Sequence, residues 1–585
     1  MKKRTIFFST LIMLLLLNFN MAFATDGAME PKSVALKLGF LTILPPLIAI
    51  VLAFITKNVV VSLFVGLFAG VFLLQLTGDF NFFSAVANSF SGVLTAIIGA
   101  LADPWNAGII LQCLFIAGLI ALISKMGGTK AIAEALAKKA NSPRSSQLIT
   151  WLLGLFIFFD DYANSLIVGP IMKPVSDKMK VSREKLSFII DATAAPIAGI
   201  ALISTWVGLE VSLIRDGFLE LGIEANAYTT FVQTIPYRFY NILILIFIVV
   251  SALLLREFGP MLKAERRART TGEVLRKGSN PLNADNNELE AKEGVKLSIW
   301  NAIIPISVLI ISAFIGFYVN GKGIILGDTD MEAIRIVTEA PFSFSAIQLA
   351  FGASDASVVL FGSALFASII AILMACSQRI LSLGEAVETW VNGMKSLMIT
   401  VIILLLAWSL SATIKQLGTS HYLVSVLSNS IPAFTLPSII FVLAGIISFA
   451  TGTSYGTMGI LMPLAIPLGH AMGGGDFNFL IITISAVLTG AVFGDHCSPI
   501  SDTTILSSMG TGCDHIDHVK TQLFYALPVG AIAILFGYIP AALGAPIYFV
   551  LPVAIIAIVL LVRFVGKPVI EPEVASSTTE VNEAI

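Results

Sequence analysis

The sequence predicts an all-α polytopic membrane protein that has about 11 crossings and two re-entrant hairpins, arranged as two inverted repeats. First, the 585 residues are 56% hydrophobic and only 12% charged, about half the charged share of a soluble domain. Second, stretches such as 242–255, 303–319 and 547–562 hold almost no charge at lengths close to those that span a bilayer core. Third, a polar motif recurs in each half of the chain.

The N-terminal segment resembles a secretory signal. Three basic residues, 2–4, precede an apolar run over residues 6–17, and the small residues within 22–24 provide a cleavage site. We therefore predict a signal peptide over residues 1–24, whose removal leaves Thr25 as an extracytoplasmic N-terminus. An uncleaved first helix is the alternative, because the apolar run has a length that either structure tolerates.

A re-entrant hairpin is predicted from two basic loops, 125–144 and 173–185, which both favour the cytoplasmic side. A single crossing between them, over residues 148–172, would place them on opposite sides. That segment also carries two acids at its middle, where a lipid-facing helix tolerates them poorly. A hairpin with its bend at residues 160–164 resolves both conflicts.

The second half of the chain repeats this pattern, and its hairpin is predicted over residues 438–468 with a polar bend at 451–457. Three residue pairs match at one constant spacing: Tyr162 with Tyr455, Pro170 with Pro463, and Pro174 with Pro467. Counting crossings then places the second half in the membrane in the opposite orientation, which is typical of secondary transporters.

The predicted crossings are residues 38–56, 59–77, 108–124, 187–207, 239–255, 298–319, 356–375, 397–414, 479–509, 521–543 and 546–563. The predicted parts are a first repeat (25–255), a cytoplasmic linker (256–297), a second repeat (298–543), a terminal transmembrane helix (544–566) and a disordered tail (567–585). The expected location is the inner membrane, with a cytoplasmic C-terminus.

Acids at membrane depth are costly and are functional by default. They cluster in four places: Asp160 and Asp161 at the first bend, Asp191 before Pro196, Asp495 and Asp502 around Pro499, and Asp355. Pro196 and Pro499 interrupt apolar segments and predict two discontinuous helices. Such breaks free carbonyl oxygens for a cation, and hard oxygen ligands suit Na⁺ or protons. The candidate ion- or substrate-binding residues are Asp160, Asp161, Asn164, Asp191, Thr193, Thr453, Ser454, Asp495, His496, Ser498, Ser501, Asp502 and Thr503.

Asp161 and Asp502 are the candidate Na⁺ ligands, although Asp161 could instead cap a half-helix. Asp355 could lie in an external loop, and the glycines and serines could serve only close helix packing. The Cys, Asp and His residues of 513–518 resemble a set of zinc ligands. A capped, solvated turn is the favoured interpretation of this segment. His496 beside Asp495 could relay a proton.

Residues 494–519, together with 159–165 and 191–196, resemble the signature of the NhaC-type Na⁺/H⁺ antiporter family. The resemblance covers nearly the whole chain after residue 24. It implies inverted repeats with paired hairpins, a homodimer and a moving transport domain. Some relatives resemble sodium-coupled exchangers of organic acids or amino acids.

The predicted function is export of Na⁺ in exchange for H⁺, and the alternative is a Na⁺-coupled transporter or exchanger of a small organic acid or amino acid. The expected partners are small ions and membrane lipid. The near-neutral net charge of the chain does not indicate binding to nucleic acid. An enzyme is not expected, because no zinc-protease motif or nucleophile elbow lies at membrane depth. No cofactor is expected, and Na⁺ and H⁺ are the transported ions.

Overall fold

The computed structural model describes residues 30–56, 58–77, 82–158, 161–281, 291–292, 294–395, 397–427 and 431–570. The predicted signal peptide, Asp160 and the tail beyond Ile570 lie outside these residues.

The first half contains α2 (Pro31–Leu38), α3 (Leu44–Thr56), α4 (Val59–Leu76), α5 (Phe82–Ala102), α6 (Pro104–Lys125), α7 (Gly128–Ala137), α8 (Pro143–Phe156), α9 (Asp161–Lys178), α10 (Arg183–Asp191), α11 (Ala195–Ala198), α12 (Val207–Leu221), α13 (Ala227–Thr234) and α14 (Phe239–Leu254). Strand β1 (Arg256–Glu257) and α15 (Gly259–Thr271) follow in the linker.

The second half contains α16 (Trp300–Leu326), α17 (Met331–Glu339), α18 (Phe344–Ala353), α19 (Ala356–Ser377), α20 (Leu383–Lys395), α21 (Met398–Leu417), α22 (Thr419–Leu427), α23 (Leu436–Thr451), α24 (Ser454–Met472), α25 (Phe477–Cys497), α26 (Asp502–Thr511), α27 (His515–Ile532), α28 (Ile539–Ala542) and α29 (Ile547–Leu560). Strand β2 (Lys567–Pro568), within the predicted tail, pairs antiparallel with β1.

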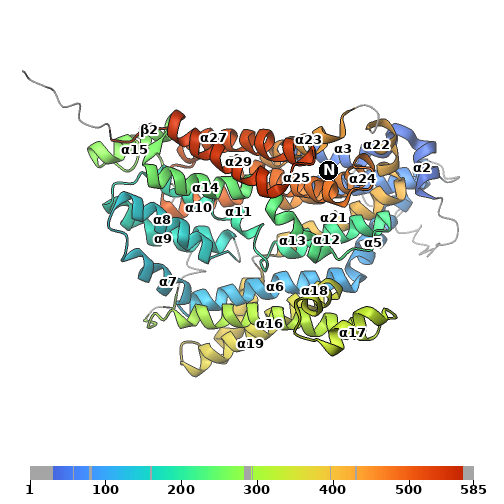
Figure 1. Cartoon of the computed structure of the whole chain (residues 1–585), viewed down its shortest axis with the longest axis horizontal. Coiled ribbons are helices and arrows are strands. Elements are labelled where there is room, and N and C mark those ends of the chain that lie inside the picture. The colour runs from blue at the N-terminus through green and yellow to red at the C-terminus, as the bar shows by residue number, and fades with distance from the viewer. Residues whose placement is uncertain are drawn as a thin grey trace, which may run out of the picture.

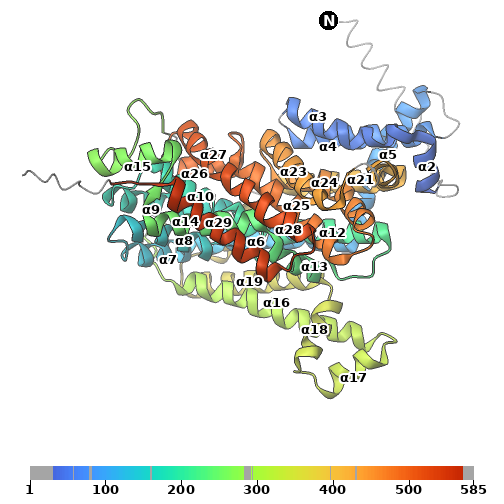
Figure 2. The same ribbon diagram turned by 45° about the horizontal axis from the view of Figure 1, so that its top comes forward.

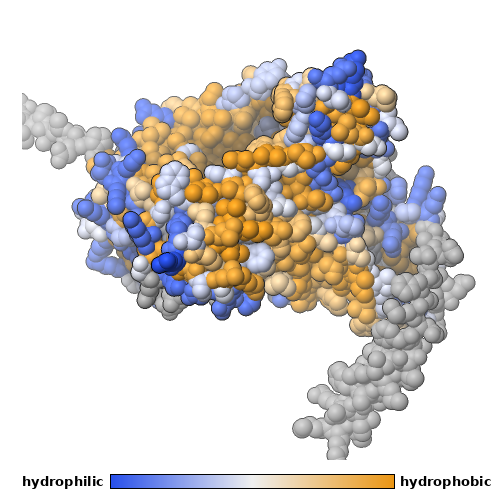
Figure 3. Space-filling view, turned by 90° about the horizontal axis from the view of Figure 1, so that it is seen from below, coloured by the Kyte–Doolittle hydropathy of each residue, from blue (hydrophilic) through white to orange (hydrophobic). Residues whose placement is uncertain are grey.

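The described residues include 11 helices that are long and apolar enough to cross a membrane, or 12 if the bent pair α13 and α14 forms one span. The predicted number of crossings agrees with this count, but the two sets differ. The 11 helices include α5 and α23, which the predicted crossings omit (Figure 1). They do not include the predicted crossing 187–207, because the chain is interrupted there between α10 and α11. Serine, asparagine, glycine and threonine recur along α5, so its apolar run is diluted and harder to recognise. Apolar side chains cover the middle of one face, with hydrophilic ones toward its ends (Figure 3).

Two hairpins enter the protein from opposite ends. Helices α8 and α9 lie at one end and α24 toward the other (Figure 1). The hydroxyls of Ser146 and Ser176, near the open ends of α8 and α9, lie 3.1 Å apart, so this segment turns back on itself. The second hairpin, α23 and α24, turns at Gly452, which has a φ of +67°.

Each hairpin is followed by an interrupted helix. The first interruption separates α10 from α11 and lies just before Pro196. The second separates α25 from α26, and Pro499 lies inside it. Both interruptions therefore occur at the prolines that predicted them. Helices α16 and α19 lie along one side of the molecule, beside α6 (Figures 1 and 2).

The second hairpin packs closely on α25 because glycines face one another. A Cβ atom added at Gly494 would lie 2.1 Å from the carbonyl oxygen of Gly445 on α23. That neighbour is backbone and cannot rotate away, so only a residue without a side chain permits this approach.

We expect Gly494→Ala to force α23 and α25 apart and to lower the free energy of unfolding by about 1–3 kcal/mol, as overpacking does. Gly362→Ala is the matched control, since a Cβ there meets nothing within 4 Å. Thermal unfolding in detergent measures both. Equal melting temperatures for the two variants would contradict this account of the contact.

Candidate functional site

The tips of the two hairpins meet at a cavity of about 270 Å³. Helix α9 contributes Asp161 and Tyr162, and the tip of the second hairpin, from the end of α23 to the start of α24, contributes residues 451–455. The second interrupted helix contributes Asp495 and residues 500–503. Two segments far apart in the sequence therefore form one polar chamber.

Three carboxylates line this cavity. The Asp495 side chain is buried, and its Oδ2 accepts a hydrogen bond from the Ser454 hydroxyl at 2.8 Å. Asp502, in the first turn of α26, accepts one from the Tyr162 hydroxyl at 3.4 Å, which links the two halves. Asp161 is buried in the first turn of α9. Asp161 therefore lies at a helix N-terminus, which favours an acidic side chain, and it also lines the cavity.

The second hairpin also contacts the second interruption directly. A Cβ atom at Gly452 would lie 2.6 Å from the carbonyl oxygen of Ile500. The Ser498 hydroxyl donates to the carbonyl of Phe449 at 2.7 Å. These contacts fix the hydroxyls of Ser501 and Thr503, 3.0 Å apart, beside the cavity.

The structure brings seven predicted residues to this cavity: Asp161, Thr453, Ser454, Asp495, Ser501, Asp502 and Thr503. Five others do not line it, namely Asn164, Asp191, Thr193, His496 and Ser498. The Asn164 amide donates to the carbonyl of Thr193 at 2.6 Å, and the Thr193 hydroxyl donates to that of Ile189. Asn164 and Thr193 therefore donate hydrogen bonds to backbone carbonyls at the first interruption.

Some lining residues were not predicted: Asn58, Thr205, Trp206, Thr400 and Tyr455. The repeat could have found Tyr455, because it corresponds to Tyr162. Asn58 caps α4 between two apolar runs, and its side chain accepts from the backbone N–H of Val61. A helix cap of this kind does not indicate, from the sequence alone, that the residue lines a cavity.

The carbonyls freed at the first interruption are held by α14. Asn241 donates to the carbonyl of Pro196 at 3.0 Å. Arg238 donates to the carbonyl of Gly199 and pairs with Glu210 at 2.6 Å, with both side chains fully buried. This ion pair joins the start of α14 to α12, because Arg238 is the N-cap of α14 and Glu210 lies on α12.

Asp355 is the N-cap of α19, where its side chain accepts from the backbone N–H groups of Ser357 and Val358. Asp514 caps α27 in the same way. Burial raises the pKa of Asp514, but backbone N–H groups of Asn280 and Asp517 outweigh it and hold the pKa below its ordinary value. Across the described residues, no group of three or more His, Cys, Asp and Glu is placed to hold a metal ion.

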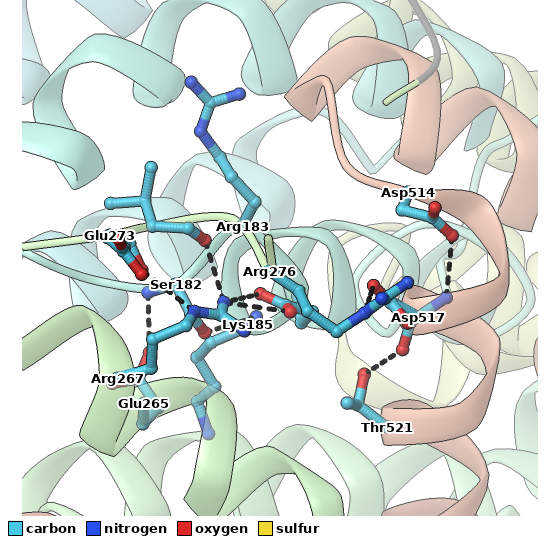
Figure 4. A network of polar contacts seen from close by, with 12 residues as sticks. Ser182, Arg183, Lys185, Glu265, Arg267, Glu273, Arg276, Asp514, Asp517 and Thr521 are labelled. Atoms are coloured by element: carbon cyan, nitrogen blue, oxygen red, sulfur yellow. Dashed lines mark hydrogen bonds and ion pairs between the residues drawn. The ribbon is translucent and has the colours of Figure 1, made fainter. Parts of the chain in front are cut away.

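The linker is anchored by ion pairs (Figure 4), and its helix α15 lies at one end of the molecule (Figure 1). Arg267 pairs with Glu184 of α10 at 2.9 Å, and Arg276 pairs with Asp517 of α27 at 2.8 Å. Arg183 donates to the carbonyls of Thr511 and Gly512. The linker thus joins α10 to α27, and Arg183 joins α10 to the end of α26.

Comparisons with known proteins agree with this architecture. The model of a family described as the Na⁺/H⁺ antiporter family matches residues 2–201 and 197–540. An uncharacterized protein of Haemophilus influenzae is 35% identical over 502 residues, which are 85% of this chain and 90% of that protein. A malate-2H⁺/Na⁺-lactate antiporter of Bacillus subtilis is 40% identical over 96 residues, 16% of this chain and 20% of its own length.

Among solved structures, the Alcanivorax borkumensis YdaH transporter resembles this fold with a TM-score of 0.50 and 12% identity. The similarity covers 79% of this chain and 90% of that one. At this identity the likeness concerns the fold alone.

Removal of Arg238 would leave Glu210 buried without its cation. We expect Arg238→Met to lower the free energy of unfolding by about 3–5 kcal/mol. Arg215→Met is the control: its pair with Asp103, at 3.5 Å, is partly exposed, and its loss changes stability by about 1–2 kcal/mol at most. Denaturation in detergent measures both, and an equal loss would contradict a structural role for the buried pair.

Proposed function

Because this chain belongs to the Na⁺/H⁺ antiporter family, we propose that it exports Na⁺ across the inner membrane in exchange for H⁺. The observation that carries the proposal is the convergence of Asp161, Asp495 and Asp502 on one cavity between the hairpin tips. Carboxylate and hydroxyl oxygens are the ligands that hard cations prefer.

Exchange follows from competition at these carboxylates. A protonated carboxyl loses the negative charge that holds a cation, so H⁺ arriving from one side releases Na⁺ to the other. The hydroxyls of Ser454, Ser501 and Thr503 lie on the same wall and supply further neutral oxygens. Two hairpin tips that meet from opposite ends suit access from one side at a time.

The test is transport by the purified protein in liposomes. Addition of Na⁺ should dissipate an imposed pH gradient, and the KM for Na⁺ should rise as the pH falls, because protons compete for the carboxylates. Absence of any response to Na⁺ or Li⁺ between about pH 6 and about pH 9 would refute the proposal.

A second candidate is a Na⁺-coupled exchanger of a small organic acid or amino acid. The cavity, about 270 Å³, approaches the roughly 300 Å³ at which small-molecule pockets begin. Helix α24 begins at the cavity with Thr453 as its N-cap, and helix N-termini favour carboxylates. The relative from Bacillus subtilis is named as an antiporter of malate and lactate.

Thermal stabilisation separates the two candidates, because a ligand of the native state raises its stability. For the second candidate, malate, lactate or an amino acid should raise the melting temperature only when Na⁺ is present. Stabilisation by Na⁺ alone, with no further effect of these compounds, would favour simple cation exchange.

Asp161→Asn and Asp502→Asn keep the shape of the side chain while removing its charge. We expect each to raise the KM for Na⁺ by at least about tenfold with little loss of folded protein. Asp355→Asn is the control, because asparagine also caps a helix and Asp355 lies outside the lining of the cavity. Normal Na⁺ dependence in both cavity variants would refute their assignment as ligands.

A further inference from the structure

A second polar cluster lies buried where α10, α25 and α27 meet. It consists of Asp191, His496, His518 and Gln522, together with Tyr240 of α14, and we call it the histidine cluster. Gln522 donates to the Asp191 carboxylate at 2.6 Å, and His518 Nε2 lies 3.3 Å from the same oxygen. All five side chains are essentially inaccessible to solvent. The sequence had favoured a solvated turn around His518, and the structure corrects this.

The histidine cluster is distinct from the cation cavity. His496 follows Asp495 directly, but only Asp495 lines the cavity. The His496 ring is held by the Tyr240 hydroxyl, 2.6 Å from its Nδ1, and the His496 carbonyl accepts from Gln522. His496 therefore lies between the two sites, with a fixed ring orientation.

Four polar atoms of this cluster have no hydrogen-bond partner among the described residues: Asp191 Oδ1, His496 Nε2, His518 Nδ1 and Gln522 Oε1. Leaving a buried polar atom unpaired costs about 1–3 kcal/mol. A cluster that served only packing would be expected to pair these atoms or to be apolar. Their concentration in one place therefore points to a ligand that the cluster takes up.

The chemistry of the cluster selects a proton as that ligand. Na⁺ prefers oxygen, whereas this cluster presents imidazole nitrogens beside a carboxylate. A carboxylate and an imidazole that share one proton are neutral overall, and loss of the proton leaves a buried anion. An uncompensated buried charge is strongly destabilising, so protonation would bias how α10 packs against α27.

Other charged or titratable groups near the pair are already engaged or belong to the cavity. Lys185 of α10 pairs with Glu257 at 2.9 Å, and Tyr525 of α27 donates to Glu257. The remaining neighbours, from α25, are Cys497 and Asp495, and Asp495 accepts from Ser454. Arg183 of α10 pairs with Asp177, and Lys520 of α27 is exposed. Among the described residues of these elements, the buried groups left to neutralise Asp191 are therefore a protonated His518 or His496.

We propose that Asp191 and His518 form a proton-binding site, separate from the cation cavity, whose occupancy sets the maximal rate of transport. The proposal rests on the proposed exchange of Na⁺ for H⁺, and it adds a second proton site to that exchange. Protonation in the cavity changes the affinity for Na⁺, whereas protonation of the Asp191 and His518 pair changes the conformational step. Gln522 and His496 are positioning residues.

The experiment measures Na⁺ transport in liposomes from about pH 6 to about pH 9, with kcat and KM for Na⁺ determined at each pH. In the native protein both parameters should change with pH, kcat by at least about threefold. In Asp191→Asn and His518→Gln, kcat should become independent of pH, while KM still rises as the pH falls. Asp191→Glu keeps a titratable group and should retain the dependence of kcat on pH.

His470→Gln removes a histidine from the last turn of α24 and should behave like the native protein. A dependence of kcat on pH that persists in both Asp191→Asn and His518→Gln, or that is absent from the native protein, would overturn the second proton site. If Asp191→Asn does not fold, as gel filtration in detergent would show, His518→Gln decides. A KM for Na⁺ that is independent of pH in the native protein would instead refute competition in the cavity.

Discussion

The constraint on which this structure depends is that polar groups at membrane depth must find partners inside the protein, because lipid offers none. Two helices are interrupted here, and each interruption frees backbone groups. At the first, Arg238, Asn241 and Asn164 donate to carbonyls that no helix satisfies. At the second, Ser498 and His515 take part, with His515 Nε2 2.7 Å from the carbonyl of Pro499. The interruptions persist because side chains from other helices replace the missing helical bonds.

The two halves use the same local pattern for different purposes. In each half an acid precedes the interrupting proline, Asp191 before Pro196 and Asp495 before Pro499. Asp495 lines the cavity, whereas Asp191 lies against Gln522 and His518. The difference arises because α27 packs on α10 and covers Asp191, while Asp495 meets the tip of the second hairpin. A repeat in sequence thus yields one acid beside a cavity and one within the core.

Charged side chains of the linker hold the ends of α10 and α27. Glu265 of the linker accepts from the backbone N–H of Ser182, and Arg267 and Arg276 bind α10 and α27 (Figure 4). The linker therefore bridges the helices that carry Asp191 and His518. A change in their relative position would be transmitted to this end of the molecule, since packed elements shift between discrete arrangements rather than deform continuously.

Composition and the spacing of apolar runs were sufficient to predict the membrane class, the approximate number of crossings, the hairpins and the interruptions at Pro196 and Pro499. These features are local, because the lipid requires apolar length and proline removes a backbone donor wherever it occurs. Helix α5 was missed because its small polar residues dilute the apolar signal. The repeat also predicted that Asp161 and Asp502 lie near one another. Only the tertiary structure decided that Asn58 and Thr400 line the same cavity, and that His518 is buried beside Asp191. Those arrangements depend on the rotation and packing of helices hundreds of residues apart, which no local pattern encodes.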